Sequence, residues 1–237
     1  MEVLVQTNNL TKRYGQHKAV NNVNLTVRKG EIYGLIGRNG AGKTTVLRLI
    51  SGLARPTEGN VCLFEQNSLD TVYTQNRVGI LIESPGVYPN MSARENVKLK
   101  CLAKGISNKS YIAELLEGVG LRAADKKKVK HFSVGMKQRL GIALALVGNP
   151  ELVLLDEPIN GLDPQGMAEI REIITKLNKD RGITFIISSH ILGELSKIAT
   201  CYGIIEKGEL KKQILKTELT EDLEEYYFNL TGGVSHD

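Results

Sequence analysis

Apolar and polar side chains alternate with a two-residue period near the start of the chain. Residues 2–6 and 20–27 follow this pattern, which predicts half-buried antiparallel strands. Residues 31–36 form a shorter, more apolar strand that ends in a glycine-rich turn, and apolar positions at helical spacing follow over residues 42–51. Residues 56–65 combine turn residues with a further strand pattern. The N-terminal part therefore predicts antiparallel β-structure beside a strand–turn–helix unit.

Helical spacing replaces the strand pattern from residue 91 to about residue 148. Continuous apolar runs return at residues 152–156 and 183–188, as is typical of strands buried on both faces of a parallel sheet. Helices are predicted over residues 96–103, 111–119, 133–147 and 164–178. This order of elements predicts an α/β fold whose core is interrupted by a helical insertion.

The chain has 237 residues, enough for one large domain, and shows no internal repeat. We expect a single domain over residues 1–237, with a core lobe of residues 1–83 and 150–215 and a helical insertion of residues 84–149. Residues 216–237 form a short C-terminal extension that is polar, acidic and predicted to be helical.

Composition narrows the possible classes of protein without choosing among them. Hydrophobic residues make up 41% of the chain, which provides for a sizeable core, and the net charge is +5. The basic run at residues 126–131 is interpreted as a solvated face, and with no Trp and four Phe we expect no nucleic-acid partner. Three separated cysteines fit reduced thiols, and neither a secretory signal nor a membrane-spanning run is seen. We therefore expect a cytoplasmic chain that reaches a membrane only through another polypeptide.

Residues 37–44 match the phosphate-binding pattern G-x-x-x-x-G-K-[ST], with an apolar strand before them and a helix after them. Glycines let backbone N–H groups surround phosphates, and the following helix directs its positive end at the same anion. Lys43 adds a positive charge near the β- and γ-phosphates, and the Thr44 hydroxyl is expected to ligate Mg²⁺. We assign nucleotide binding to Gly37, Arg38, Asn39, Gly40, Ala41, Gly42, Lys43, Thr44 and Thr45. Kinases, GTPases and other ATPases share this loop, so it leaves the class of enzyme open.

Two adjacent carboxylates follow the apolar strand that begins at residue 152. Asp156, at the strand tip, is placed to hold Mg²⁺ through water, while strand alternation turns Glu157 the other way. Glu157 is predicted to act as the general base toward an attacking water molecule. A solvated acidic turn would explain these two residues if they stood alone. The phosphate loop in the same chain favours the catalytic interpretation.

Further motifs follow in the order found in the ATPase subunits of ABC transporters, and the chain resembles this family up to about residue 210. Tyr14 matches the aromatic residue that stacks on adenine, and residues 132–139 resemble the LSGGQ signature. Residues 161–163 match the D-loop, and His190 follows a buried strand as the family histidine does. The resemblance implies a RecA-like P-loop NTPase core with an antiparallel β subdomain and an inserted α-helical subdomain.

In this family the signature binds the γ-phosphate of ATP held by the opposite subunit, so ATP lies between two head-to-tail subunits. The resemblance implies that Ser133 and Gly135 complete the partner's site, that Asp163 belongs to the nucleotide site, and that His190 contacts the γ-phosphate. As an N-cap, Ser133 is expected to leave free N–H groups at the start of its helix. Simpler interpretations stay open: packing for Tyr14, a structural histidine at position 190, and an ordinary capped core helix after Ser133.

The sequence departs from the family pattern at four positions. Glu83 stands where the family usually has glutamine, and its carboxylate is expected to approach Mg²⁺ and to act as an extra proton acceptor. Val134 and Met136 replace a glycine and the glutamine of the signature, and Arg38 adds a charge at the mouth of the phosphate loop. Glu83 and its flanking segment resemble the branch that exports bacitracin-type and lantibiotic peptides. The alternative is that Glu83 is a surface residue, although Gln75 competes poorly for the family position because it precedes the strand.

Together these residues predict a cytoplasmic ATPase, peripheral on the membrane, that binds ATP and Mg²⁺ as a homodimer or heterodimer and drives a separate membrane permease. The predicted catalytic residues are Lys43, Glu83, Glu157 and His190, and the predicted metal ligands are Thr44, Glu83 and Asp156. The groove near residues 83–96 is expected to receive the permease. Three alternatives stay open: an ABC ATPase acting on ribosomes or DNA, one serving another export substrate, and a small-molecule kinase with the same loop.

Overall fold

The computed structural model describes residues 2–67 and 76–232. The first part of the chain contains β1 (Val3–Tyr14), β2 (His17–Val23), β3 (Thr26–Arg28), β4 (Ile32–Ile36), α1 (Lys43–Ile50), β5 (Glu58–Leu63), β6 (Gln66–Asn67) and β7 (Val78–Leu81). The second part contains α3 (Ala93–Ala103), α4 (Lys109–Gly118), α5 (Val134–Ala145), β8 (Leu152–Asp156), α6 (Pro164–Arg181), β9 (Thr184–Ser189), α7 (Leu192–Leu195), β10 (Cys201–Glu206), β11 (Glu209–Leu215) and α8 (Leu223–Thr231). Short 3₁₀ turns lie at residues 122–124, 129–131 and 216–218.

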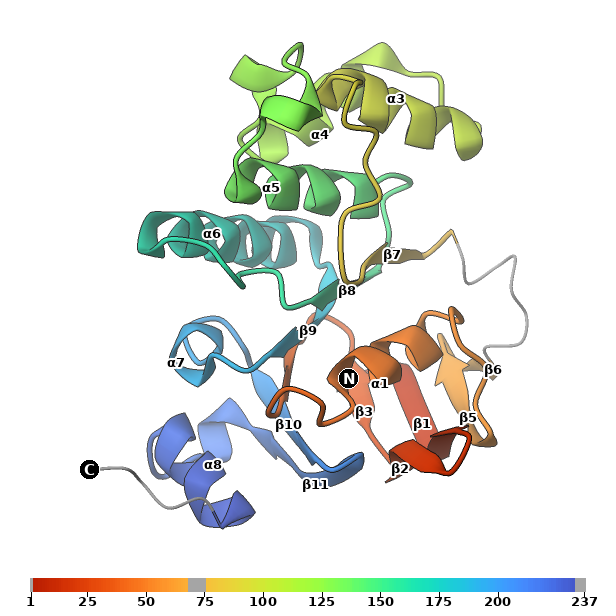
Figure 1. Cartoon of the computed structure of the whole chain (residues 1–237), viewed down its shortest axis with the longest axis vertical. Coiled ribbons are helices and arrows are strands. Elements are labelled where there is room, and N and C mark those ends of the chain that lie inside the picture. The colour runs from red at the N-terminus through yellow and green to blue at the C-terminus, as the bar shows by residue number, and fades with distance from the viewer. Residues whose placement is uncertain (1, 68–75, 233–237) are drawn as a thin grey trace.

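Two sheets form the framework of the molecule (Figure 1). The larger sheet has six strands in the order β11-β10-β4-β9-β8-β7, in which β10 and β11 pair antiparallel and the other neighbours pair parallel. The smaller sheet contains β1, β2, β3, β5 and β6, which pair antiparallel. Because parallel strands run in one direction, the carboxyl ends of β4, β8 and β9 meet at one edge of the larger sheet.

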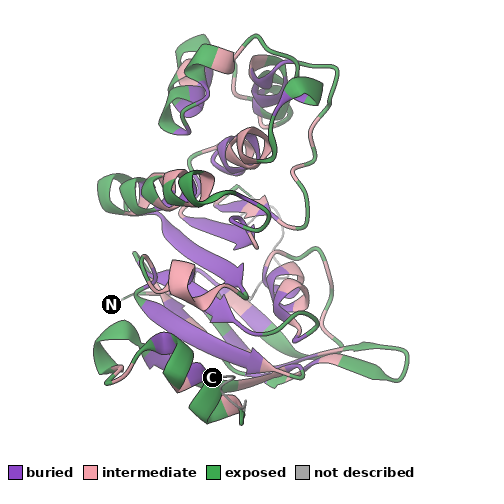
Figure 2. Ribbon diagram, turned by 60° about the vertical axis from the view of Figure 1, so that its left-hand side comes forward, coloured by how far each residue is buried: buried purple, intermediate pink, exposed green. Residues whose placement is uncertain are grey.

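Alternate side chains of the larger sheet enter two separate apolar cores. Ile32 and Ile36 of β4 pack in a core shared with α3 to α6, whereas Tyr33 and Leu35 pack in a core shared with α1 and the smaller sheet. The central strands are buried along their length (Figure 2). Burial on both faces explains the continuous apolar runs from which β8 and β9 were predicted.

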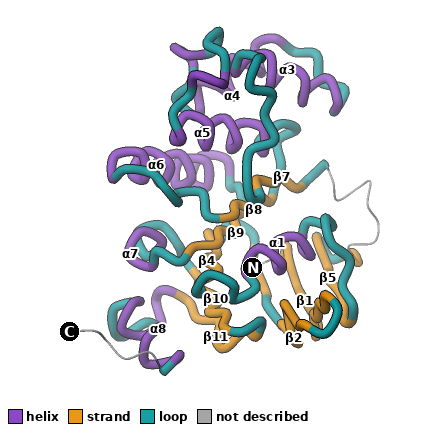
Figure 3. The backbone as a smooth tube through the Cα atoms, viewed as in Figure 1, coloured by secondary structure: helices purple, strands orange, loops and turns teal. Residues whose placement is uncertain are grey.

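Helices α3, α4 and α5 lie between β7 and β8 in chain order and gather at one end of the molecule (Figure 3). A capping box begins α3, in which the Ser92 side chain accepts from the Glu95 N–H at 3.2 Å and the Glu95 carboxylate accepts from the Ser92 N–H at 2.7 Å. Val97, Leu116 and Leu140 join the three helices in the first core. The predicted α/β fold with antiparallel β-structure and inserted helices is confirmed.

The structure differs from the sequence-based expectations in the strands. β1 continues far beyond the predicted residues 2–6, and the positive φ of 49° at Asn9 explains why its apolar–polar alternation is broken. The strand predicted at residues 20–27 is two strands, β2 and β3, which pair with different parts of β1. β10 and β11 are two further strands that the sequence-based prediction lacks.

The acidic C-terminal extension contains α8, as its composition predicted. Leu223 and Tyr227 of α8 are buried in the first core, and α8 packs against α7. Arg38 of the phosphate loop lies close enough to the Tyr227 hydroxyl to affect its pKa. Burial raises the pKa of Tyr227, and the nearby Glu206 carboxylate raises it further, while the Arg38 charge and backbone lower it. The end of the described chain thus lies near the phosphate loop.

Within residues 2–67 and 76–232, no helix combines the length and apolarity needed to cross a bilayer.

Candidate nucleotide-binding site

The phosphate loop joins β4 to α1 and lies against the turn between β10 and β11. The Gly208 N–H donates to the Ala41 carbonyl at 2.9 Å. A Cβ added to Gly37 would lie 2.3 Å from a backbone oxygen of β10, and one added to Gly42 would lie 2.5 Å from a backbone oxygen of β2. Gly42 also has a φ of 108°, so both space and backbone conformation require glycine there.

Lys43 is buried at the first residue of α1, where it is 6% exposed. Its Nζ donates to the carbonyls of Gly37 at 2.7 Å and Arg38 at 3.3 Å, and it lies 3.1 Å from Glu157 Oε1. Gly42 is the N-cap of α1 and provides no side-chain hydrogen bond to the first N–H groups of the helix. Backbone donors and one positive charge therefore converge at a point suited to phosphate.

A carboxylate and two hydroxyl groups meet where β8 and β9 end. The Thr44 hydroxyl donates to Asp156 Oδ2 at 2.9 Å, and the Ser188 hydroxyl donates to Asp156 Oδ1 at 2.6 Å. Thr44 and Asp156, predicted as metal ligands, are thus adjacent, and their oxygen atoms are of the kind that Mg²⁺ prefers. Ser188 was not predicted as a site residue. Two buried serines end β9 after an apolar run, and this was the signal that could have pointed to it.

Glu157 follows the last residue of β8 and adopts a φ of 48°. The expectation that strand alternation orients Glu157 is therefore wrong, because the strand has ended at Asp156. The Glu157 carboxylate lies 3.1 Å from the Lys43 ammonium through Oε1 and 2.8 Å from His190 Nδ1 through Oε2. Its N–H donates to Ser188 Oγ at 2.9 Å. The fold thus brings Glu157 into direct contact with both Lys43 and His190.

The predicted signature residues form a separate surface at the starts of α5 and α6. Ser133, Gly135 and Asp163 line a hollow of about 430 Å³. The Ser133 side chain accepts from the Met136 N–H at 3.2 Å, and the Asp163 carboxylate accepts from the Gly166 N–H at 3.0 Å, so both helices are capped. Val134, which replaces a family glycine, is 59% exposed beside this hollow.

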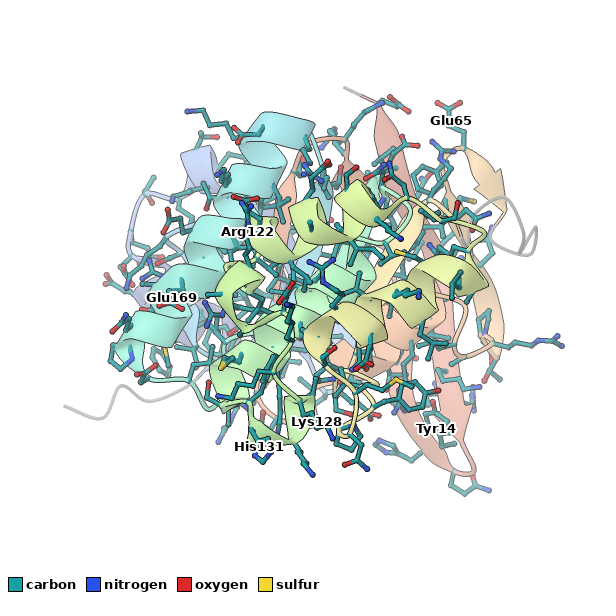
Figure 4. All side chains as sticks on the ribbon, turned by 90° about the horizontal axis from the view of Figure 1, so that it is seen from above. Tyr14, Glu65, Arg122, Lys128, His131 and Glu169 are labelled. Atoms are coloured by element: carbon teal, nitrogen blue, oxygen red, sulfur yellow. The ribbon has the colours of Figure 1, made fainter. Side chains whose placement is uncertain are left out.

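Tyr14 is the last residue of β1, and its side chain is exposed rather than packed in a core. Lys12 Nζ lies 5.1 Å from the centre of the Tyr14 ring, which is a cation–π distance. Tyr14, Lys128 and His131 lie along the same side of the molecule when it is viewed from above (Figure 4). An exposed ring is what stacking against a nucleotide base requires. Tyr14 is therefore not a core residue, and its stacking on adenine stays a prediction.

Glu83 lies in the segment that follows β7 and has a φ of 65°. Its carboxylate forms an ion pair with Arg48 of α1. Among the described side chains, no hydrogen bond or ion pair joins Glu83 to Thr44 or Asp156. Gln75, the other residue considered for this position, lies outside the described residues. Arg48 is the partner that the sequence did not identify.

A second hollow, of about 390 Å³, lies beside the segment that follows Glu83. It extends between β7, α3 and α5, and the exposed side chains of Leu53, Tyr88 and Leu99 line it. Asn96 fixes the backbone of Tyr88, because its Oδ1 accepts from the Tyr88 N–H at 2.8 Å and its Nδ2 donates to the Tyr88 carbonyl at 3.2 Å. Exposed apolar side chains around a hollow are typical of a protein contact surface.

The parallel sheet order and the contacts around Lys43 and Asp156 define a P-loop nucleotide-binding protein. A sequence profile described as ABC transporter matches residues 20–160. The chain therefore belongs to the ABC transporter family, in which it is an ATP-binding subunit that hydrolyses ATP. The small-molecule kinase considered from the sequence is excluded.

Relatives and solved structures agree with this assignment. The chain is 47% identical over 220 residues to bacitracin transport ATP-binding protein BcrA of Enterococcus faecalis, a match that covers 92% of this chain and 71% of the relative. It is 44% identical over 228 residues to lantibiotic transport ATP-binding protein SrtF of Streptococcus pyogenes, covering 95% of this chain and 96% of the relative. The dimeric, post-hydrolysis structure of the ATP-binding cassette MJ0796 bound to ADP and Pi matches with a TM-score of 0.82 at 27% identity, over 90% of this chain and 99% of that chain.

Proposed function

We propose that this ATPase drives a membrane permease that expels peptide antibiotics of the bacitracin or lantibiotic type. The observation that carries this proposal is the similarity to SrtF, which extends over 95% of this chain and 96% of that lantibiotic transport protein at 44% identity. The similarity to a bacitracin transport ATPase supports the same substrate class. In this proposal the chain is cytoplasmic and peripheral, and it meets the membrane through the permease.

The site residues are assigned roles in ATP hydrolysis. Lys43 and the loop N–H groups hold the β- and γ-phosphates, and Thr44 and Asp156 hold Mg²⁺, which neutralises phosphate charge. Glu157 accepts a proton from the attacking water, and His190 orients the Glu157 carboxylate and contacts the γ-phosphate. Support comes from the 2.8 Å contact between His190 Nδ1 and Glu157 Oε2 and from the 2.9 Å bond between Thr44 and Asp156.

Two subunits are proposed to enclose ATP between them, as identical or different chains. Tyr14 stacks on the adenine of the ATP bound by its own subunit. Ser133, Gly135 and Asp163 approach the γ-phosphate held by the other subunit, to which they offer a hydroxyl and two helix N-termini. Support comes from the hollow that these three residues line and from the dimeric ADP-bound cassette that the fold matches.

The permease is proposed to occupy the hollow beside Tyr88 and Leu99. Its apolar rim suits a helix end from a membrane protein, and the segment of residues 83–88 connects the hollow to the nucleotide side of β7. Closure of the ATPase dimer around ATP would thereby move the permease, and hydrolysis would let both reopen.

A growth experiment with a hydrolysis-deficient variant tests the proposal. Cells that produce the chain with its permease should tolerate more bacitracin or nisin-like lantibiotic than cells with Glu157→Gln, because loss of a general base lowers turnover by about 10²- to 10⁴-fold. Glu114→Gln, an exposed acid on α4, is the matched control and should keep the protection. Equal susceptibility of wild-type and Glu157→Gln cells across both antibiotic classes would contradict the proposed function.

A further inference from the structure

The ion pair between Arg48 and Glu83 connects the helix that follows the phosphate loop with the segment that leaves β7. Arg48 lies one helical turn after Thr44 on α1, so both residues are on the same face of that helix. Glu83 is held by a left-handed backbone with a φ of 65°. The side chains of Arg48 and Glu83 are 36% and 60% exposed, so water competes for this contact and the pair is able to open.

The same carboxylate has two possible partners. Arg48 holds it in this structure, whereas the Thr44 hydroxyl, one helical turn from Arg48 on α1, is bonded to the Asp156 carboxylate at 2.9 Å. A carboxylate paired with a guanidinium is less available to a divalent cation, because the guanidinium and the cation bind the same carboxylate oxygen atoms. The strength of the ion pair therefore sets how readily Glu83 turns toward a metal ion.

We propose that Arg48 is a positioning residue that controls whether the Glu83 carboxylate joins Thr44 and Asp156 at Mg²⁺. The inference rests on the proposed function for the identity of the metal and nucleotide. A glutamine at position 83 would offer Arg48 no charge. This control therefore depends on the Glu83 carboxylate, which stands where the family usually has glutamine.

A double-mutant cycle on metal-dependent nucleotide binding tests the inference. A fluorescent ATP analogue is bound to wild type, Arg48→Met, Glu83→Gln and the double variant, and Mg²⁺ is titrated. We expect Arg48→Met to lower the half-saturating Mg²⁺ concentration by about two- to five-fold, the range of an exposed ion pair. The same substitution in the Glu83→Gln background should change it little. Equal shifts in both backgrounds, or no shift in either, would overturn the proposal.

Two controls separate this coupling from other effects. Arg122→Met removes an exposed ion pair with Glu117 at 2.9 Å on the helical insertion and should leave the Mg²⁺ titration unchanged. Unfolding midpoints of all variants should agree with wild type, because the Arg48 and Glu83 side chains are partly exposed. If the coupling is present while cells gain no protection from the antibiotics, the proposed substrate class fails and the role of Arg48 stands.

Discussion

Ser188 shows how one buried hydroxyl organises both carboxylates of the nucleotide site. It donates to Asp156 Oδ1 at 2.6 Å and accepts from the Glu157 N–H at 2.9 Å. Its side chain is fully buried in β9, so neither bond is open to competition from water. The orientation of the predicted metal ligand and of the predicted base therefore depends on a residue of the neighbouring strand.

Replacing Ser188 with alanine should affect both stability and turnover. The substitution leaves two buried groups without their partner, which costs about 1–3 kcal/mol of folding free energy. Loss of support for a metal ligand lowers activity by roughly 10- to 100-fold. Chemical unfolding and the ATPase rate at saturating Mg²⁺ measure the two effects. Ser189→Ala, which loses a local bond with Ile191, is the control, and an equal loss of activity there would contradict the role of Ser188.

The sequence predicted the candidate site residues whose spacing is fixed by one motif, and the structure places them side by side. Lys43 and Thr44 are placed by the loop pattern, and Asp156 by the strand that it ends. The contributions of Ser188 and Arg48 depend instead on which strands and helices become neighbours. Sheet order is a property of the folded chain, so these contacts could not be predicted from the spacing of residues within one segment.

At the scale of elements, the turn between β4 and α1 is shaped by its neighbours as much as by its own sequence. Gly40 and Gly42 both have positive φ values, 80° and 108°. A Cβ at Gly40 would meet nothing within 4 Å, whereas one at Gly42 would lie 2.5 Å from a backbone oxygen of β2. A substitution at Gly40 therefore introduces backbone strain alone, whereas one at Gly42 introduces backbone strain and a steric clash.

Alanine at these two positions should destabilise the chain to different extents. Gly40→Ala adds the cost of a left-handed alanine, about 1–2 kcal/mol. Gly42→Ala adds the same strain and a clash with β2, for a further cost of about 1–3 kcal/mol. Thermal unfolding should show the larger drop for Gly42→Ala, at about 2–4 °C per kcal/mol for a domain of this size. Equal midpoints for the two variants would mean that β2 does not confine the loop.

Elements with a regular period were predicted well, and irregular ones were not. β8 and the helices α3 to α6 follow continuous or helical apolar patterns, and their predicted positions are close to those found. The pairing of β1 with its neighbours contains register shifts, which interrupt its apolar–polar alternation. The full length of β1 was therefore not predicted from the sequence. β11 exposes several polar residues as the edge strand of its sheet, so its pattern resembles that of a surface loop.

At the scale of the whole molecule, the larger sheet separates two cores that meet the nucleotide site from opposite sides. The core with α1 and the smaller sheet supports the phosphate loop, and the core with the inserted helices supports the signature hollow. Strands β4, β8 and β9 join the two sides, because their alternate side chains belong to both cores.

Because Tyr227 lies near Arg38 of the phosphate loop, a probe on the C-terminal helix should report ATP binding. A dye on Leu230→Cys, at an exposed position of α8, should change its emission when ATP binds, because Arg38 shifts with the loop. The background replaces Cys62 with serine, since Cys101 and Cys201 are buried. The same dye on Lys179→Cys, at an exposed position near the end of α6 and just before β9 begins, lies at the sheet edge opposite the phosphate loop and should stay silent. A response at both positions or at neither would contradict this view of α8, and a response at Leu230 alone would provide an optical sensor of nucleotide occupancy.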